Sequence, residues 1–432
     1  MRIPQGNESV NCNMAVVATT TSLPGGQLEL AVNSSMAPSL NNTTLYEEQS
    51  NFINVTNELP IQYAQPLYGY VMPFLLVVTI ISNTLIVVVL SKRHMRTPTN
   101  VVLMAMALSD MFTLLFPAPW LFYMYTFGNH YKPLAPPAAC YAWSFMNEVI
   151  PALFHTASIW FTLALAVQRY IYVCHAPVAR TWCTMPRVLK CIGWISLLAV
   201  LHQSTRFIDR TYHTVEIEWR GEKVDVCVMR HSFLVEDVID TYYLAYFGFR
   251  VIFVHAVPCV SLVVLNVLLF RAMRIAQLKR ERLFQENRKS ECKRLRDSNC
   301  TTLMLIVVVT VFLAVEIPLA VVTVLHIISS SSIIDILDYN IANLLILFTN
   351  FFIIVSYPIN FAIYCGMSRQ FRETFKELFI RGNASSSSQG AERTHTGMAS
   401  RRGNTSCTRK NGTSSRYSLV NGPRTCTNET VL

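Results

Sequence analysis

The chain has 432 residues, of which 52% are hydrophobic and only 14% are charged. Ordinary soluble proteins carry about 25% charged residues, and here the charge is missing from long blocks, which predicts a membrane protein. A net charge of +10 could indicate nucleic-acid binding. The basic residues lie beside apolar segments instead, which favours a membrane surface over nucleic acid as a partner.

Residues 1–65 are predicted to form a disordered, extracellular tail. The tail is rich in Asn, Ser and Thr and has no apolar core of the kind that a secretory signal needs, so the first span is expected to insert the chain. A cluster of glycosylation sequons predicts a glycosylated tail, with acceptors at Asn7, Asn33, Asn41, Asn42 and Asn54.

Seven apolar segments follow the tail, and each approaches or exceeds the roughly 20 residues that cross a bilayer. They lie at about 66–91, 98–126, 140–174, 188–206, 241–272, 300–328 and 340–366. Lys and Arg crowd the connections after the first, third and fifth spans, so the positive-inside rule predicts an extracellular N-terminus and a cytosolic C-terminus. We therefore predict an all-α membrane protein with a seven-helix domain over residues 66–367.

Two further segments follow the last span. In residues 368–381, the apolar side chains of Phe371, Phe375, Leu378 and Phe379 fall on one helical face, which predicts a short amphipathic helix on the lipid surface. Residues 382–432 are polar and are predicted to be disordered. A hydroxyl residue two places before a terminal leucine, Thr430 before Leu432, fits a PDZ-type ligand, with chance as the alternative.

Asp110 lies midway along the second span, and ionisable groups inside membranes are functional candidates by default. Polar residues of other spans could meet it, and their oxygens would suit a small cation such as sodium. The alternative is a hydrogen-bonded cluster around a neutral Asp110. These polar residues are Asn83, Ser158, Ser356 and Asn360.

Glu148, Arg250 and Glu316 are expected to converge in the half of the bundle nearest the tail. An acid there could hold a cationic ligand group, and Arg250 could hold a carbonyl or amide oxygen. We favour a structural pair between Arg250 and Glu316 and a ligand contact for Glu148. Histidines of the spans, including His155 and His255, show no two-His metal spacing and are interpreted as satisfied helix residues.

Arg169 ends the very apolar third span, within Gln168-Arg169-Tyr170. A charge in that place either faces the bundle or reaches to the interface. The order of motifs along residues 66–380 resembles the rhodopsin-like G-protein-coupled receptors. The matching positions are Asn83, Asp110, Ser158, Gln168 to Tyr170, Pro258, Pro318, Asn360 to Tyr364, and Phe371.

This resemblance implies a site at each level of the bundle. Asp110, Ser158 and Asn360 would form a sodium site. Pro258 and Pro318 would kink the fifth and sixth helices. A G-protein cleft would be lined by Gln168, Arg169, Tyr170 and Tyr364.

Cys140 opens the third span, and Cys227 lies in the acidic loop after the fourth span. We expect the two to form an extracellular disulfide that pins this loop over the mouth of the bundle, with free thiols as the alternative.

The chain departs from the family pattern at several positions. Gln168 replaces an acid, Glu316 replaces a tryptophan and Asn266 replaces a tyrosine. Phe361 replaces a proline, so less kinking is expected there. Pro151 stands near where amine receptors place an Asp, which argues against a biogenic amine ligand.

Three runs, at 123–133, 166–186 and 364–377, resemble insect neuropeptide receptors of the sex-peptide and myoinhibitory-peptide type. This implies a plasma-membrane receptor for an extracellular peptide, coupled to inhibitory G proteins, with arrestin and a receptor kinase as further partners.

Other classes of protein fit less well. A proton-coupled transporter could use Asp110, Glu148 and Glu316, but no internal repeat is apparent. A retinal protein needs a lysine in the seventh span, and residues 339–367 contain none. No enzyme motif and no cofactor other than sodium are indicated.

Overall fold

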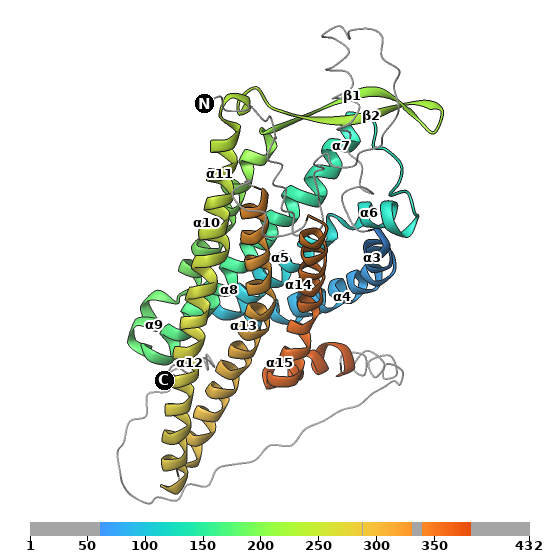
Figure 1. Ribbon diagram of the computed structural model, residues 1–432. Coiled ribbons are helices and arrows are strands. Elements are labelled where there is room, and N and C mark those ends of the chain that lie inside the picture. Colours follow the sequence, from blue (N-terminus) through green and yellow to red (C-terminus); the bar gives the residue numbers. More distant parts are fainter. Residues whose placement is uncertain (1–60, 287, 331–338, 382–432) are drawn as a thin grey trace, which may run out of the picture.

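The computed structural model describes residues 61–286, 288–330 and 339–381. Long helices form a bundle, and a β-hairpin crosses one end of it (Figure 1). In this part of the chain, seven helical segments are long and apolar enough to cross a membrane, which confirms the predicted architecture. We call the two ends of the bundle the hairpin end and the α15 end.

The first two spans pack closely at the hairpin end. Gly69 lies against the backbone of the second span, where an added Cβ would stand 2.9 Å from the Tyr125 carbonyl oxygen. The Thr126 hydroxyl donates to the Gly69 carbonyl at 2.9 Å, so only glycine fits there. The first span comprises α3 (Ile61–Pro66), η1 (Leu67–Val71) and α4 (Met72–Leu90), and so begins within the predicted tail. After η2 (Arg93–Met95), the second comprises α5 (Pro98–Leu115), α6 (Ala118–Leu121) and η3 (Phe122–Thr126).

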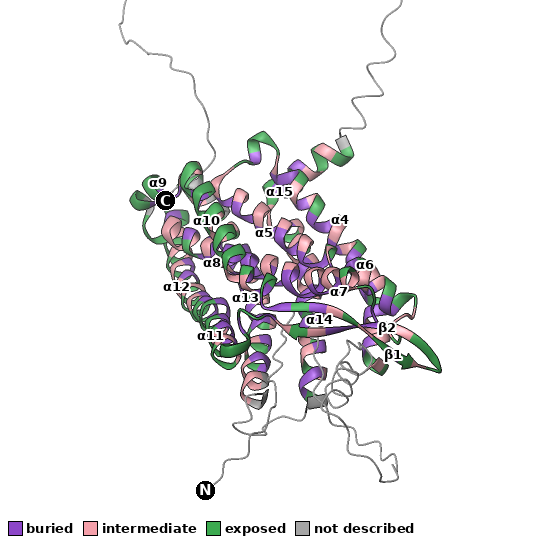
Figure 2. Ribbon diagram, turned by 90° about the horizontal axis from the view of Figure 1, so that it is seen from above, coloured by how far each residue is buried: buried purple, intermediate pink, exposed green. Residues whose placement is uncertain are grey.

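The third span is the centre of the bundle. Of its most apolar window 72% is buried, against 11% for the fourth span, which lies at the periphery (Figure 2). The third span comprises α7 (Pro137–Ser144), the π-helical η4 (Phe145–Val149) and α8 (Ile150–Cys174). The fourth follows a short helix, α9 (Ala176–Trp182), and comprises α10 (Met185–Ser204) and η5 (Thr205–Phe207).

The segment between the fourth and fifth spans is an antiparallel hairpin, which the all-α prediction missed. Strands β1 (Arg210–Trp219) and β2 (Glu222–His231) pair along their full length. Arg220 and Gly221 both have positive φ at the tip, 54° and 84°, as a two-residue turn that matches strand twist requires.

The fifth and sixth spans continue beyond the other helices at the α15 end (Figure 1). The fifth comprises η6 (Glu236–Val238), α11 (Ile239–Phe249), the π-helical η7 (Arg250–Ala256) and α12 (Val257–Gln285); the sixth is α13 (Lys289–Ser330). The basic connection between the predicted fifth and sixth spans, residues 273–299, is therefore mostly helix. Pro258 stands at the start of α12, directly after η7, and Pro318 lies inside α13.

The seventh span, α14 (Tyr339–Met367), contains Pro358, which lies just before the matched motif at Asn360 to Tyr364. Because proline lacks an N–H, it removes a helical hydrogen bond three residues before Phe361, so the missing family proline is partly replaced. The predicted surface helix exists as α15 (Arg369–Lys376) and η8 (Glu377–Arg381). Ser368 caps it by accepting a hydrogen bond from the Phe371 N–H at 3.2 Å.

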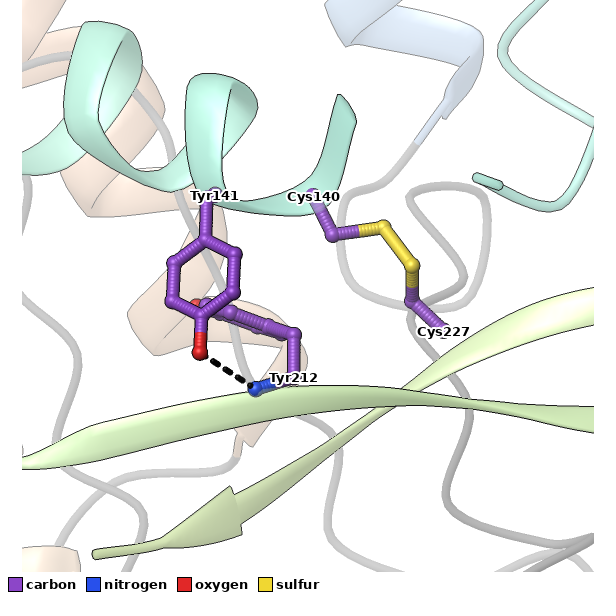
Figure 3. The surroundings of a disulfide bond; sticks show 4 residues. All are labelled: Cys140, Tyr141, Tyr212 and Cys227. Atoms are coloured by element: carbon purple, nitrogen blue, oxygen red, sulfur yellow. Dashed lines mark hydrogen bonds between the residues drawn. A yellow bond between two sulfur atoms is a disulfide. The ribbon is translucent and has the colours of Figure 1, made fainter. Parts of the chain in front are cut away.

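The predicted disulfide joins Cys140 of α7 to Cys227 of β2 (Figure 3). Beside it, the Tyr212 N–H donates to the Tyr141 hydroxyl at 3.2 Å, and the two rings meet edge-on. The Cys227 N–H also donates to the Leu134 carbonyl at 2.9 Å. The hairpin is thus fixed to the start of the third span by covalent and non-covalent contacts.

We expect Cys140→Ser, Cys227→Ser and the double variant to lose the same thermal stability, since each removes the same bond. Losing a native disulfide costs about 2–5 kcal/mol. Cys174→Ser, at an exposed free cysteine, is the matched control and should melt like the parent. Melting of the purified protein measures this, and additive losses in the double variant would contradict the expectation.

Candidate functional site

Asp110 is buried in the middle of the bundle and is bound by two of the predicted partners. Its carboxylate accepts hydrogen bonds from the Ser158 hydroxyl at 2.5 Å and from the Asn360 amide at 3.4 Å. The other two predicted partners bind elsewhere: Asn83 donates to the Thr79 carbonyl, and Ser356 donates to the Ile353 carbonyl. Three spans therefore meet at one carboxylate.

A cavity of about 20 Å³ adjoins this carboxylate, which is room for about one water-sized group. Carboxylate, hydroxyl and amide oxygens are the ligands that hard cations prefer. Asp110, Ser158 and Asn360 therefore fit a small cation, once the Asn360 amide turns its oxygen towards it. The cavity is also lined by His155, Glu316, Ser356 and Tyr357.

Glu316 is fully buried in α13, and its carboxylate lies between two histidines of other helices. Its Oε1 is 2.8 Å from Nδ1 of His255 in η7, and its Oε2 is 3.3 Å from Nε2 of His155 in α8. His155 Nδ1 lies 3.5 Å from the Tyr357 hydroxyl of α14. The third, fifth, sixth and seventh spans are therefore joined by one polar chain.

The predicted pair between Arg250 and Glu316 is wrong. Both carboxylate oxygens of Glu316 lie beside histidines instead, Oε1 beside His255 and Oε2 beside His155. The sequence predicted both histidines to be satisfied helix residues, because spacing within one segment does not reveal partners that lie on different helices. The sequence does contain a usable pattern. Two spans each carry one histidine, and both histidines are expected at the same depth in the membrane as the glutamate of a third span.

Glu148 lies in η4 and belongs to a buried ionic cluster at the hairpin end. Its Oε2 is 3.2 Å from Arg210 and 3.4 Å from Arg206. Asp209 completes the cluster, at 2.5 Å from Arg206 and 3.8 Å from Arg210. The Arg206 guanidinium also lies over the Tyr246 ring, 5.4 Å from its centroid.

The cluster ties the third span to the base of the hairpin. Burial is the largest single influence and lowers the pKa of Arg210, but Glu148, together with Asp209 and two neighbouring tyrosines, raises that pKa well above its ordinary value, so Arg210 stays charged. Glu148 and Arg250 line one small cavity, so these two converge as predicted, whereas Glu316 lines the deeper one. A cationic ligand group would have to displace an arginine to reach Glu148.

The α15 end holds the predicted coupling residues. Gln168 is buried, and neither amide atom has a hydrogen-bond partner among the described residues. The Arg169 guanidinium lies 5.8 Å from the centroid of the Tyr172 ring. Tyr170 packs on Leu269 and Met273 of α12. Without an acidic neighbour, Arg169 is not held by the residue before it.

Tyr364 connects the seventh span to the surface helix. Its ring is 5.8 Å from that of Phe371, which is fully buried under α14. The centroid of the Phe361 ring is 6.0 Å from that of Phe371 and 6.2 Å from that of Phe375. The residue that replaces the family proline therefore helps to pack α15 against α14.

Asn266, which replaces the family tyrosine, donates to the Thr310 hydroxyl of α13 at 2.9 Å. It thereby joins the fifth and sixth spans. The predicted glycosylation sites and the C-terminal Thr430 and Leu432 lie outside the described residues.

Glu316→Gln should lower the thermal stability of the purified protein, because the amide keeps the volume but removes the charge between two histidines. Breaking a buried pair costs roughly 3–5 kcal/mol. Glu218→Gln, at an exposed hairpin carboxylate, is the control. His255→Gln should add little to the loss in Glu316→Gln, since the two share one interaction. Unchanged melting of Glu316→Gln would contradict the cluster.

Comparisons with known proteins agree with this geometry. Residues 70–382 match the family model described as serpentine type 7TM GPCR chemoreceptor Srw. The chain is 60% identical over 386 residues to the sex peptide receptor of Drosophila melanogaster, covering 88% of this chain and 83% of the relative. It is 35% identical to the sex peptide receptor-related protein 2 of Caenorhabditis elegans, covering 73% and 72%.

A more distant relative is the FMRFamide receptor of Drosophila melanogaster, at 27% identity over 71% of this chain and 52% of the relative. These matches confirm the predicted resemblance and give no support to a transporter. The family consists of multi-pass membrane receptors rather than enzymes. The chain is therefore a member of the rhodopsin-like G-protein-coupled receptors, within the branch of neuropeptide receptors.

Proposed function

We propose that the chain is a plasma-membrane receptor for an extracellular peptide of the sex-peptide and myoinhibitory-peptide type, and that it signals through inhibitory heterotrimeric G proteins. The observation that carries the proposal is the 60% identity to a sex peptide receptor over 88% of the chain. The G-protein class rests on the family resemblance of the coupling segment.

The hairpin end is proposed to face outwards and the α15 end to face the cytosol. Lys92, Arg93 and the basic ends of α12 and α13 lie at the α15 end. Acidic side chains mark the hairpin instead: Glu216, Glu218, Glu222 and Asp225. The positive-inside rule supports this orientation.

The peptide enters under the hairpin, which the disulfide holds over the bundle. Glu148 acts mainly through Arg206 and Arg210, because its carboxylate is occupied by both. Arg250 lines the cavity below and supplies a donor for a carbonyl or amide oxygen. Glu316 lies deeper and senses the ligand through the positions of His255 and His155 rather than by contact.

Activation is a population shift between two arrangements of the spans. A movement of η7 or α8 at the hairpin end lengthens the contacts of His255 or His155 with Glu316. The loss of these contacts lets α13 move. The α15 end of α13 then opens a cleft lined by Gln168, Arg169, Tyr170 and Tyr364, into which a G-protein helix inserts. A sodium ion held by Asp110, Ser158 and Asn360 would bind the resting arrangement more tightly.

Further partners follow from the family and from the tails. Arrestin and a receptor kinase would bind the same end as the G protein. A PDZ protein would take the end of the chain at Thr430 and Leu432, and lipid would take the apolar face of α15.

The direct test is a cAMP readout in cells given synthetic myoinhibitory peptides and sex peptide. We expect nanomolar to micromolar peptide to lower stimulated cAMP in a pertussis-toxin-sensitive way. Arg169→Ala should keep surface expression and peptide binding but lose the response. Surface-expressed receptor that neither binds nor responds at micromolar peptide would overturn the ligand class.

Asp110→Asn should abolish the sodium dependence of agonist affinity, because the amide keeps the Ser158 contact but not the charge. In the parent, raising sodium should weaken agonist binding at constant ionic strength, with choline replacing sodium. Asn83→Ala is the control, since Asn83 binds its own helix and not Asp110. An Asp110→Asn variant that responds to sodium like the parent would disprove the site.

A further inference from the structure

A second pocket, of about 390 Å³, lies at the hairpin end between α6–η3 and the segment that leads into α7. We call it the α6 pocket. Its lining is Pro119, Trp120, Tyr123, Lys132, Pro133, Leu134, Ala135 and Ala139. This lining contains two aromatic side chains, one ammonium group and no carboxylate, and the remaining side chains are apolar.

The α6 pocket lies at the surface of the hairpin end of the second span. On the last turns of the second span, Leu121, Met124 and Tyr125 are buried against the other helices. Of the pocket residues, Tyr123 is 41% exposed and Lys132 is exposed, whereas Trp120 packs partly against the core and Leu134 is buried. In a membrane, exposed side chains at this end of a span are open to lipid.

The depth of the pocket places it among lipid headgroups. The second span has 29 residues, so it is about 43 Å long, which matches a bilayer with its headgroup regions. Trp120 and Tyr123 lie in the last seven residues, in about the final 10 Å. Tryptophan and tyrosine are enriched at this level of membrane spans.

The walls of the α6 pocket are held in place from several sides. The Leu134 carbonyl accepts from the Cys227 N–H, next to the disulfide. The Asn129 amide donates to the Tyr123 carbonyl at 3.1 Å, and the Lys132 N–H donates to the Asn129 carbonyl at 3.0 Å. The cavity therefore needs little ordering on binding, which favours a specific ligand.

The chemistry of the walls selects the headgroup. Trp120 and Tyr123 stand edge to face, 6.1 Å apart at 85°, and form two walls of an aromatic corner. Aromatic faces attract quaternary ammonium groups, and the Lys132 ammonium attracts a phosphate. A phosphocholine headgroup carries both groups side by side. We infer that the α6 pocket binds the headgroup of a phosphatidylcholine-type phospholipid from the surrounding leaflet.

The test counts lipids retained by the full chain, purified in a neutral maltoside detergent, by native mass spectrometry. Dioctanoyl phosphatidylcholine is titrated against the phosphatidylethanolamine and phosphatidylglycerol of the same chain length. We expect one phosphatidylcholine to be retained about three- to tenfold more tightly than either, since only it offers a quaternary ammonium group. Equal retention of all three lipids would overturn the inference.

Variants locate the lipid. Lys132→Gln and Trp120→Leu should each weaken phosphatidylcholine retention about three- to tenfold, and Lys132→Arg should keep it. Lys223→Gln, at an exposed hairpin lysine, and Trp194→Leu, at a 63% exposed lipid-facing tryptophan of α10, are matched controls. Retention that is unchanged in Lys132→Gln and Trp120→Leu would overturn the site. Displacement of the lipid by saturating peptide agonist would assign the pocket to the peptide instead.

Discussion

The bundle is organised by the need to give polar partners to the ionisable groups that it buries. A single charge inside a membrane is costly, and a buried pair is tolerated only when its geometry is good and its remaining atoms are satisfied. Glu316 meets this need with a histidine on either side, His155 and His255, from two other spans. The polar chain thereby fixes the rotation of α8, η7 and α13 relative to one another.

The same rule produces a second polar layer near the hairpin end, where Glu148 and Asp209 meet Arg206 and Arg210. This layer joins a membrane span to the hairpin, whereas the Glu316 layer joins spans only. The disulfide and the cluster anchor the hairpin at two places, one on β2 and one at the start of β1. A ligand that shifts the hairpin therefore acts on η4, and η4 continues directly into the helix that carries His155.

The spans could be predicted because a long apolar run is visible in the sequence without any knowledge of which residues contact one another. The Cys140–Cys227 bond and the contacts of Asp110 with Ser158 and Asn360 were also foreseen, because their motifs come in a fixed order. The hairpin was not predicted, although apolar residues alternate along Val215 to Trp219 and Val224 to Val228 on either side of Arg220-Gly221, which is the pattern of two strands joined by a turn.

For Glu148, Arg250 and Glu316, the partners on other helices were not determined by the sequence. A π-helical stretch adds residues to a turn and changes which side chains face the bundle beyond it. Two such stretches, η4 and η7, carry Glu148 and Arg250 and precede or include His155 and His255 in their spans. Arg250 and Glu316 were paired because each is an ionisable group within a span, and in the structure His255, from the same π-helical stretch as Arg250, lies beside Glu316.

The resting arrangement also needs a restraint that most of this family place beside the arginine of the third span. Here Gln168 offers an amide but no charge, and its amide atoms have no protein partner in the described part of the chain. Among the described residues, a buried acid–base contact joins α8 to α13 where His155 Nε2 lies 3.3 Å from Glu316 Oε2. It lies fourteen residues, or about 21 Å, from Arg169 along the helix. In the proposed mechanism, a contact at that depth restrains α13 near its middle, and the α15 end of α13 is then held by weaker contacts such as that of Asn266 with Thr310. Under that proposal, a ligand that moves η4 or η7 changes the restraint directly.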